Sequence, residues 1–489
     1  MSNYSTEERN NRQLILWGED GQAAVDNARV VVLGSDCVAS EFLKNIVLHG
    51  FGNVTIIDNA IVNEEDLKSN FLVDAADLGK PRAESIANLL RELNEEIKVQ
   101  AKNQNPEDLS FINEDPKPGF VITCGNLKPS FLIELNRICR EKHIPQGHIQ
   151  SSGLFGAFYL DAGLHEIYEG PYNGTLLCEC RAKEPFPKLA EYFNSFSYED
   201  PHFPSPAIFY RAITNLKNEG KSSPDSDEIK KEIYKIQGSN QRVCFIEALQ
   251  KVGTFKMQVI PLNTKDVFQI ANKHSENKEP FWEIARAASR FTQTHKILPH
   301  YGGCPDLETS SEIYLKLKQI YAEKSKEDWD EIRKDLAEHN ANVDEKTLAH
   351  FAKNILRIDA VDYHPLSHCI NFVSSSNNEN GDVTVQCLFV AVRNFYEKNN
   401  RQPQNTKEDQ DALIAEIKQL GSKYVGDDEV VADYVKEYTS AKGHIIPSVA
   451  ATIGAIFAQE VTKIVIHQAK PVKGAFIYNA VKCSGKTFD

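Results

Sequence analysis

The 489-residue sequence predicts an α/β protein in which a doubly wound domain is interrupted by a large, mainly helical insertion. Three observations support this fold class. Short β-branched runs alternate with amphipathic segments between Arg29 and Gly163, long charged segments follow, and one last helix and strand lie near residue 489. Apolar strands that alternate with helices are typical of a parallel sheet covered on both faces.

The expected strands of the first region are rich in β-branched and aromatic residues. They read ARVVVLG, NVTIID, KVQAK, GFVITCG and FGAFYLDA. Helix-like segments separate them, so we expect residues 1–170 to form the first part of the doubly wound domain.

Residues 171–442 have a different character, with charged segments such as DEIKKEIYKIQ that favour helices. We expect them to form the mainly helical insertion. Residues 443–489 predict one helix with an apolar face and then a strand from Ala475. One helix and one strand cannot form a domain, so we expect them to complete the first sheet.

Composition narrows the classes of function. The net charge of -14 argues against broad binding to nucleic acids or anionic membranes, because both require a basic surface. The first residues lack a signal-like region, and the apolar run SVAATIGAIFAQEVTKIVIH contains Gln459, Glu460 and Lys463, which is too polar for a membrane span. We expect protein partners, free thiols, and a cytoplasmic and nuclear location.

The turn after the first strand, GSDCVASE, keeps only Gly34 of a glycine-rich phosphate-binding turn. Such turns work because bare backbone approaches the phosphates and donates amide hydrogens to them. Asp36 would instead place a carboxylate where a polyphosphate lies, and the two charges would repel. The sequence therefore predicts a lost phosphate site, and Asp36 also suits a cap of the following helix.

Asp58 keeps one alternative open. It lies roughly 24 residues after Gly34, at the end of the second strand, where an acid can accept hydrogen bonds from ribose hydroxyls. An NAD-dependent oxidoreductase is therefore conceivable, although the retained glycine is a weak signal.

Two further groups of residues were considered as sites. Cys178 and Cys180 lack zinc-site spacing and a nearby base that would activate a nucleophile, so we expect neither to be catalytic. His364, His368 and Cys369 suggest metal ligands, but no second ligand cluster follows them. A helix turn with solvent-facing histidines is the preferred interpretation, and no metal site is expected.

The order of several motifs resembles the adenylation domain of the ubiquitin-like-protein activating enzymes. These motifs are NRQLILWGEDGQ, VVVLG, KNIVLHGFGNVTIID, LGKPRAE and GAIFAQEVTKI. The insertion adds EPFPKLAEYF, FWEIARAASRFTQTHKILP and GGCPDLETSSEIYLKLKQIY, which resemble regulatory subunits of the heterodimeric activating enzyme of the neddylation pathway. The resemblance covers nearly the whole chain. It implies a Rossmann-like pseudo-adenylation domain and an insertion that resembles a catalytic-cysteine domain without the cysteine.

In active members of this family, the resemblance implies an ATP site with a ribose-binding acid, an Asn, an Arg, a phosphate-binding Lys and a metal-binding Asp. The acid is retained here as Asp58. Asp66 stands for the Asn, Ser69 for the Arg, Arg82 for the Lys and Gly125 for the metal ligand. Together with the altered turn, these changes remove the charge neutralisation that ATP chemistry needs. We therefore expect this chain to bind no cofactor itself.

The resemblance also implies a catalytic partner subunit that holds ATP and magnesium, adenylates the C-terminal glycine of a ubiquitin-like protein and transfers it to its own cysteine. In the family, the arginine that matches Arg12 reaches the partner's triphosphate in trans, a task that suits a permanently charged, forked guanidinium. The alternative for Arg12 is an exposed side chain in a surface salt bridge. Alternatives for the whole chain are the small subunit of the SUMO-activating enzyme, which has a shorter insertion, the oxidoreductase, and an adaptor without an enzyme partner.

Overall fold

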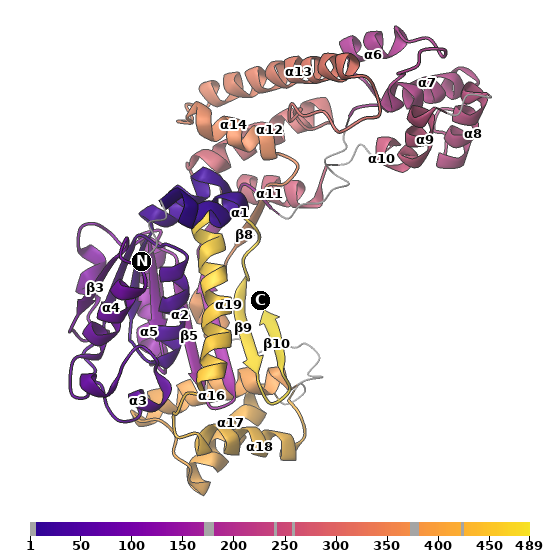
Figure 1. Cartoon of the computed structure of the whole chain (residues 1–489). Coiled ribbons are helices and arrows are strands. Elements are labelled where there is room, and N and C mark those ends of the chain that lie inside the picture. The colour runs from indigo at the N-terminus through magenta and orange to yellow at the C-terminus, as the bar shows by residue number, and fades with distance from the viewer. Residues whose placement is uncertain (1–5, 171–179, 239–241, 257–259, 372–380, 422–424) are drawn as a thin grey trace. The chain divides into compact units, whose positions relative to one another are not determined.

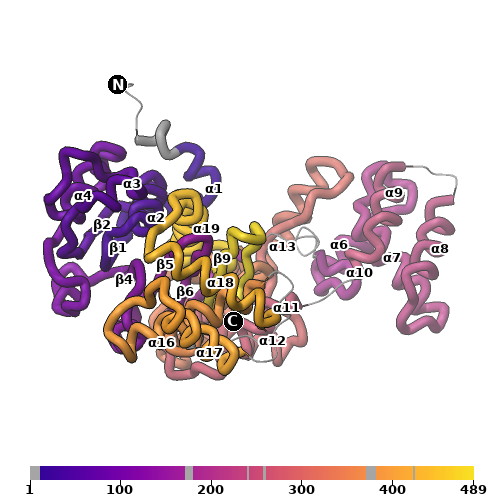
Figure 2. Tube along the Cα trace, turned by 90° about the horizontal axis from the view of Figure 1, so that it is seen from below, coloured from indigo at the N-terminus to yellow at the C-terminus, as the bar shows by residue number. Residues whose placement is uncertain are grey.

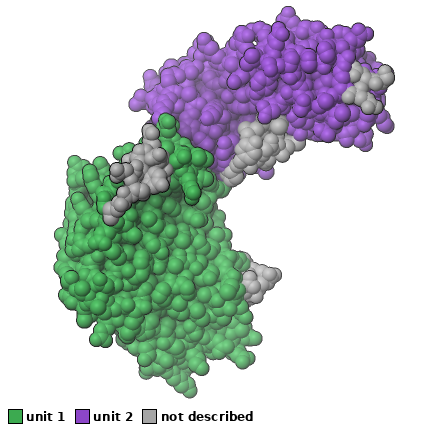
Figure 3. Space-filling model, in the orientation of Figure 1, with its two compact units in different colours: residues 1–165, 361–489 green, residues 166–360 purple. Residues whose placement is uncertain are grey.

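The computed structural model describes residues 6–170, 180–238, 242–256, 260–371, 381–421 and 425–489. The chain divides into two compact units (Figure 3). Unit 1 comprises residues 1–165 and 361–489, and unit 2 comprises residues 166–360. Unit 1 contains the large sheet, and unit 2 is mainly helical.

Unit 1 is built on an eight-stranded sheet with the strand order β10-β9-β6-β5-β4-β1-β2-β3 (Figure 1). The strands from β3 to β5 are parallel, and β6, β9 and β10 extend the sheet in antiparallel fashion. Their bounds are β1 Arg29–Leu33, β2 Asn53–Ile57, β3 Lys98–Lys102, β4 Phe120–Cys124, β5 Gln146–Ser152, β6 Phe155–Asp161, β9 Gly474–Asn479 and β10 Ser484–Phe488.

The doubly wound fold expected from the sequence is confirmed. All five expected strands are present, and the late strand returns to the first sheet because β9 pairs with β6, with Phe155 opposite Asn479. The sequence did not predict β5 or β10. The side chains of Gln146, His148 and Gln150 in β5 are fully or almost fully buried, and this polar pattern concealed a central strand.

Helices cover both faces of the sheet. Residues of β6 alternate between them: Phe158 packs on Phe457 of α19, whereas Tyr159 lies in a core shared with other helices. The first layer consists of α2 Cys37–Leu48, α4 Arg82–Leu93 and α19 Pro447–Ile466, and α1 Thr6–Asn27 packs on α19. The second layer includes α5 Pro129–Glu141, α15 Leu366–Asn371 and α16 Asp382–Asn399.

α19 is the one helix of the described chain that is long and apolar enough to cross a membrane by those two measures. Its expected apolar face is buried in unit 1, against α2, β5 and β6. The buried positions include Val449, Ile453, Phe457 and Val461. The packing explains the apolar run as the central helix of a core.

The division into units differs slightly from the expected boundary at residue 170, where unit 1 ends at residue 165, and strongly from the one at residue 442. The insertion was expected to extend to residue 442, but α16, α17 Lys407–Gly421 and α18 Asp428–Ser440 belong to unit 1. Figure 2 shows them in orange, and α16 contacts β9 and β10. Their exposed faces are charged, like those of the insertion. Their buried faces share a hydrophobic core with β6, β9 and β10, so they complete one layer of the sheet domain.

Unit 2 has the mainly helical character that was expected. Its helices are α6 Pro187–Asn194, α7 Ser205–Asn218, α8 Ser226–Gln237, α9 Val243–Gln250, α10 Val252–Lys256, α11 Leu262–Lys273, α12 Pro280–His295, α13 Ser311–Glu338 and α14 Glu345–Asn354. One apolar core joins α6 to α10 with α13. The chain passes between the units in β7 Leu164–Ile167 and β8 Asp359–Asp362, which form a two-stranded sheet.

Candidate functional site

The candidate site lies at the carboxyl ends of β1, β2 and β4 in unit 1. Gly34 follows β1 with φ 96°, and its amide donates to the carbonyl of Ile57 at 3.0 Å. A Cβ atom at Gly34 would lie 3.2 Å from the carbonyl oxygen of Cys124. Gly34 is therefore required by backbone conformation and by close packing of the strand ends.

Four side chains form a network of ion pairs and hydrogen bonds beside this turn. We call it the Arg82 cluster, and its members are Ser35 after β1, Asp58 after β2, Asp66 at the start of α3 and Arg82 at the start of α4. The Arg82 guanidinium donates from Nη2 to Asp58 Oδ2 and from Nη1 to Asp66 Oδ1, both at 2.9 Å. Its Nε donates to Ser35 Oγ at 3.1 Å, and Ser35 donates to Asp58. Burial disfavours the charged guanidinium, but the two carboxylates outweigh that effect and raise the pKa of Arg82.

The two carboxylates of the Arg82 cluster are fully engaged. Asp58 is 4% exposed, and its Oδ1 accepts from the amide of Ala60 at 3.0 Å. Asp66 is 8% exposed, and its Oδ2 accepts from the amide of Asn63 at 3.0 Å. Each carboxylate oxygen therefore has a donor inside the protein, including those of the acid expected to meet a ribose.

Asp36 caps α2, as expected, and lies beside Gly125. Its Oδ1 accepts from the amide of Ala39 at 3.0 Å. Its other oxygen would lie 3.0 Å from a Cβ atom at Gly125, which has φ 83°. Burial raises the pKa of the Asp36 carboxyl, with Asp58 adding to the effect and Ala39 and Arg82 opposing it. A second carboxylate at position 125 would meet the first at close range.

The structure brings most of the expected site residues together. Asp36, Asp58, Asp66, Arg82 and Gly125 surround the turn. Ser69, at the end of α3 Asp66–Ser69, instead donates to the carbonyl of Glu65 at 3.1 Å.

Sequence reasoning missed two buried groups at this turn. Ser35 links Asp58 to Arg82, and its only signal in the sequence was a small polar residue directly after Gly34. Cys37 donates from Sγ to the carbonyl of Ser69 at 3.1 Å, and burial raises the pKa of its thiol to about 12. The Cys37 thiol is therefore unreactive at neutral pH.

Arg12 lies away from the Arg82 cluster, in the first part of α1. Its side chain is exposed, and it has no ion-pair partner among the side chains that the structure describes. The neighbouring Ile15 and Leu16 are 76% and 74% exposed. α1 breaks at Gly18, where φ is 71° and ψ is 179°.

Two hydrogen bonds attach α1 to the rest of unit 1, at residues that follow Arg12 in the helix. Gln13 donates to the carbonyl of Leu48 at 3.4 Å, and Gln468 donates to the carbonyl of Trp17 at 3.0 Å. The exposed cation is thus carried by a helix that is held to the sheet domain.

The cysteine and histidine candidates give no catalytic arrangement in the described residues. Cys178 lies outside the described residues, and Cys180 is 2% exposed in the core of unit 2. His364 and His368 are exposed and lie at the start of α15, whereas burial raises the pKa of the Cys369 thiol to about 12. The interpretation as a helix turn with solvent-facing histidines is confirmed.

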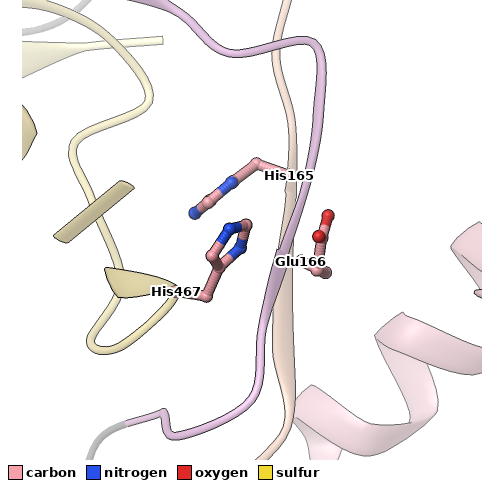
Figure 4. Close-up of side chains that lie close together, drawn as sticks. All are labelled: His165, Glu166 and His467. Atoms are coloured by element: carbon pink, nitrogen blue, oxygen red, sulfur yellow. The ribbon is translucent and has the colours of Figure 1, made fainter. Parts of the chain in front are cut away.

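A second histidine pair, not noticed in the sequence, lies within unit 1. Figure 4 shows His165 and His467, whose rings stack with centroids 5.0 Å apart, together with Glu166, the first residue of unit 2. Burial, with a smaller effect of His467, lowers the pKa of His165 well below its ordinary value. His165 is therefore a neutral ring that packs against its neighbour.

Comparisons with known proteins agree with the motif analysis. A model of the ThiF family matches residues 10–488. The NEDD8-activating enzyme E1 regulatory subunit of Danio rerio is 26% identical over 534 residues, which cover 99% of this chain and 98% of that protein. The protein of the same name from Caenorhabditis elegans is 26% identical over 544 residues and covers 100% of both chains.

Other similarities are more limited. SUMO-activating enzyme subunit 1 of Xenopus laevis is 32% identical over 159 residues, which cover 32% of this chain and 45% of that protein. Among solved structures, E. coli MccB matches with a TM-score of 0.29 and 21% identity over 32% of this chain and 46% of that chain. The full-length matches confirm the resemblance to regulatory subunits of the activating enzyme of the neddylation pathway.

Proposed function

The chain belongs to the ThiF family, and on that premise we propose that it is the non-catalytic, regulatory subunit of a heterodimeric NEDD8-activating enzyme. In this role, a catalytic partner binds ATP and magnesium, adenylates the C-terminal glycine of the ubiquitin-like protein and receives it on its own cysteine as a thioester. The full-length relatives support this role over that of the SUMO-activating subunit, which matches about a third of the chain.

The observation that carries the proposal is the internal pairing of the Arg82 cluster. A nucleotide site needs cations that are free to meet phosphates and an acid that is free to meet the ribose. Here the guanidinium is bound by Asp58 and Asp66, and Asp36 lies at the turn. Removing one partner of a buried ion pair costs about 3–5 kcal/mol. This cost disfavours nucleotide binding by this chain, which supports leaving ATP chemistry to the partner.

Arg12 is the residue that we propose takes part in catalysis, by reaching the partner's ATP site in trans. Two features support this role. Arg12 is exposed and lacks an ion-pair partner among the described side chains, and Ile15 and Leu16 beside it present apolar surface of the kind that a protein partner covers.

The first experiment is to recover the tagged chain gently from its own cell extract and to identify stoichiometric partners by mass spectrometry. We expect one partner that carries a glycine-rich turn, a metal-binding aspartate and a conjugating cysteine. Recovery of the chain alone would contradict the heterodimer. The same tagged chain, followed by microscopy, tests the expected cytoplasmic and nuclear location.

Calorimetric titration of the purified chain with ATP–magnesium and with NAD then separates the remaining alternatives. We expect binding of neither ligand by the isolated chain and one ATP per assembled heterodimer. Micromolar ATP binding by the isolated chain would contradict the non-catalytic role, and NAD binding would favour an oxidoreductase. An adaptor without an enzyme partner predicts no nucleotide binding in any recovered complex.

A further inference from the structure

A hollow of about 280 Å³ lies on the sheet of unit 1, against β1, β2 and β3. Its floor includes a row of three paired residues, Arg29, Asn53 and Lys98, one from each strand. The next row on the same face contributes Thr55. The hollow belongs to the sheet face opposite α2 and α4, where Val31 and Phe111 share a core.

The chemistry of this floor is unusual for a doubly wound sheet. Helices normally cover both faces of such a sheet, and its strands are therefore apolar. In β3, however, exposed Lys98 and Gln100 alternate with buried Val99. The chain between β3 and β4 crosses this face with only the 3₁₀ helix η2 Leu109–Asn113, so the polar row stays open.

The charges in the hollow are only partly compensated. Lys102 pairs with Glu114 at the rim. Arg29 and Lys98 are exposed and have no ion-pair partner among the described side chains. Neighbouring strands are about 4.8 Å apart, so these two cations flank Asn53 at a separation from which both flexible side chains reach one small anion.

We propose that this hollow is a binding site for a phosphate monoester. A doubly charged, tetrahedral phosphate suits the four polar groups that line the hollow: the guanidinium of Arg29, the ammonium of Lys98, the amide of Asn53 and the hydroxyl of Thr55. The volume lies just below the range of about 300–1,000 Å³ that is usual for drug-sized ligands, so it fits a phosphate with a small attached group. Asp115 at the rim disfavours longer polyanions.

Phosphorus NMR titration of the full-length chain, purified with any partner that accompanies it, tests the site with inorganic phosphate and phenyl phosphate. We expect saturable binding that weakens at least about tenfold in the double variant Arg29→Gln/Lys98→Gln, because two cations are lost. Both side chains are exposed, so the fold is preserved, and circular dichroism checks this. Lys117→Gln, on the same rim segment but outside the hollow, is the matched control.

Any phosphate that binds at a partner's nucleotide site would bind equally to the parent chain, the double variant and the Lys117→Gln control. The test therefore rests on the difference in phosphate affinity between these three proteins. Equal affinity in the double variant, an equal loss in Lys117→Gln, or binding that does not saturate would overturn the proposal.

A phosphoserine peptide compared with phenyl phosphate then identifies the source of the phosphate. Tighter binding of the peptide indicates a phosphorylated protein side chain, whereas tighter binding of phenyl phosphate indicates a free small molecule. Both results support the site.

Discussion

Two arginines of unit 1 lie in opposite environments. Arg82 is turned inward, where two buried carboxylates and a serine hydroxyl hold its guanidinium. Arg12 is turned outward on α1, without an ion-pair partner among the described side chains. The guanidinium of Arg82 is bound within the protein, whereas that of Arg12 is exposed at the surface.

This difference shows that one domain can hold one arginine inside a polar network and present another at its surface. The strand ends still converge at the turn, so the frame is intact. The polar groups of the Arg82 cluster satisfy one another, as buried polar atoms generally must.

The largest effect is expected for Arg82→Ala. Loss of the guanidinium leaves Asp58 and Asp66 buried without their cation, and we expect the free energy of unfolding to fall by about 3–5 kcal/mol. Urea denaturation of the purified chain measures it. The control is Arg137→Ala, whose pairs with Glu134 and Glu141 are exposed, so we expect a change below about 1 kcal/mol. A loss for Arg82→Ala as small as that of the control would show that the Arg82 cluster contributes no more than a surface ion pair.

Arg12→Ala tests the outward arginine. We expect ATP–pyrophosphate exchange by the assembled heterodimer to slow by about a hundredfold, since one transition-state donor is typically worth that much. Assembly, followed by gel filtration, should be unchanged. Asn11→Ala is an uncharged control on the same exposed stretch. Normal exchange with Arg12→Ala would exclude the role in trans.

Gly125→Ala sharpens the comparison at the turn. The new Cβ atom would lie 3.0 Å from the Asp36 carboxylate at a backbone with φ 83°, and we expect a loss of about 1–2 kcal/mol in unfolding free energy. Gly163→Ala, with φ 64° and nothing within 4 Å, isolates the backbone contribution.

In an Asp36→Ser background the cap is kept and the carboxylate is gone, so the loss at position 125 should become smaller. Chemical denaturation of the single and double variants gives the coupling between the two positions. Strict additivity would mean that Asp36 and residue 125 do not interact.

The smallest effect concerns pH. Burial raises the pKa of Asp36 in the folded state, so as the pH rises the carboxyl of the unfolded chain loses its proton first. The free energy of unfolding therefore falls as the pH increases from the pKa of the unfolded state through that of the folded state. Asp36→Asn keeps the cap but cannot ionise. We expect its unfolding free energy, relative to the parent, to increase between pH 4 and pH 7.

Asp225→Asn should show the opposite sign. Asp225 caps α8, and the hydrogen bond from the amide of Glu228 lowers the pKa of its carboxyl. Stability from Asp225 is therefore gained as the pH rises, and the asparagine variant loses it. Denaturation at pH 4 and pH 7 compares each asparagine variant with the parent. If the unfolding free energies of Asp36→Asn and Asp225→Asn changed in the same direction relative to the parent, the raised pKa of Asp36 would be contradicted.

The fold was largely predictable because short β-branched runs alternate with amphipathic segments in the sequence, and this alternation is typical of a doubly wound sheet. β5 escaped prediction because polar residues occupy its buried positions, where sequence patterns lead one to expect apolar ones. One of them, His148, has its Nδ1 atom 2.9 Å from Thr123 Oγ1. The helices α16 to α18 were assigned to the insertion because their charged faces gave no sign of which core their apolar faces join.

The sequence analysis identified several residues that lie close together at the candidate site, but not their arrangement. The altered turn, Asp58 and Gly125 could be identified from motifs. Arg82 pairs with Asp58 and Asp66 because the end of β2, α3 and the start of α4 come together in the folded domain, and no spacing in the sequence predicts this approach. The position of Ser35 between Asp58 and Arg82 likewise depends on the folded domain and could not be predicted from the sequence.

The pairing of β6 with β9 also governs the order in which the protein can be assembled during synthesis. β6 is made before unit 2, whereas its neighbour β9 is made after it. The nascent chain therefore carries an unpaired strand edge for the whole time that unit 2 takes to leave the ribosome. Such edges promote aggregation, and pairing across so long a loop is slow. The β9 edge of β6 therefore stays without its partner until translation reaches β9, and this is the stage of synthesis at which the chain is most exposed to misassembly.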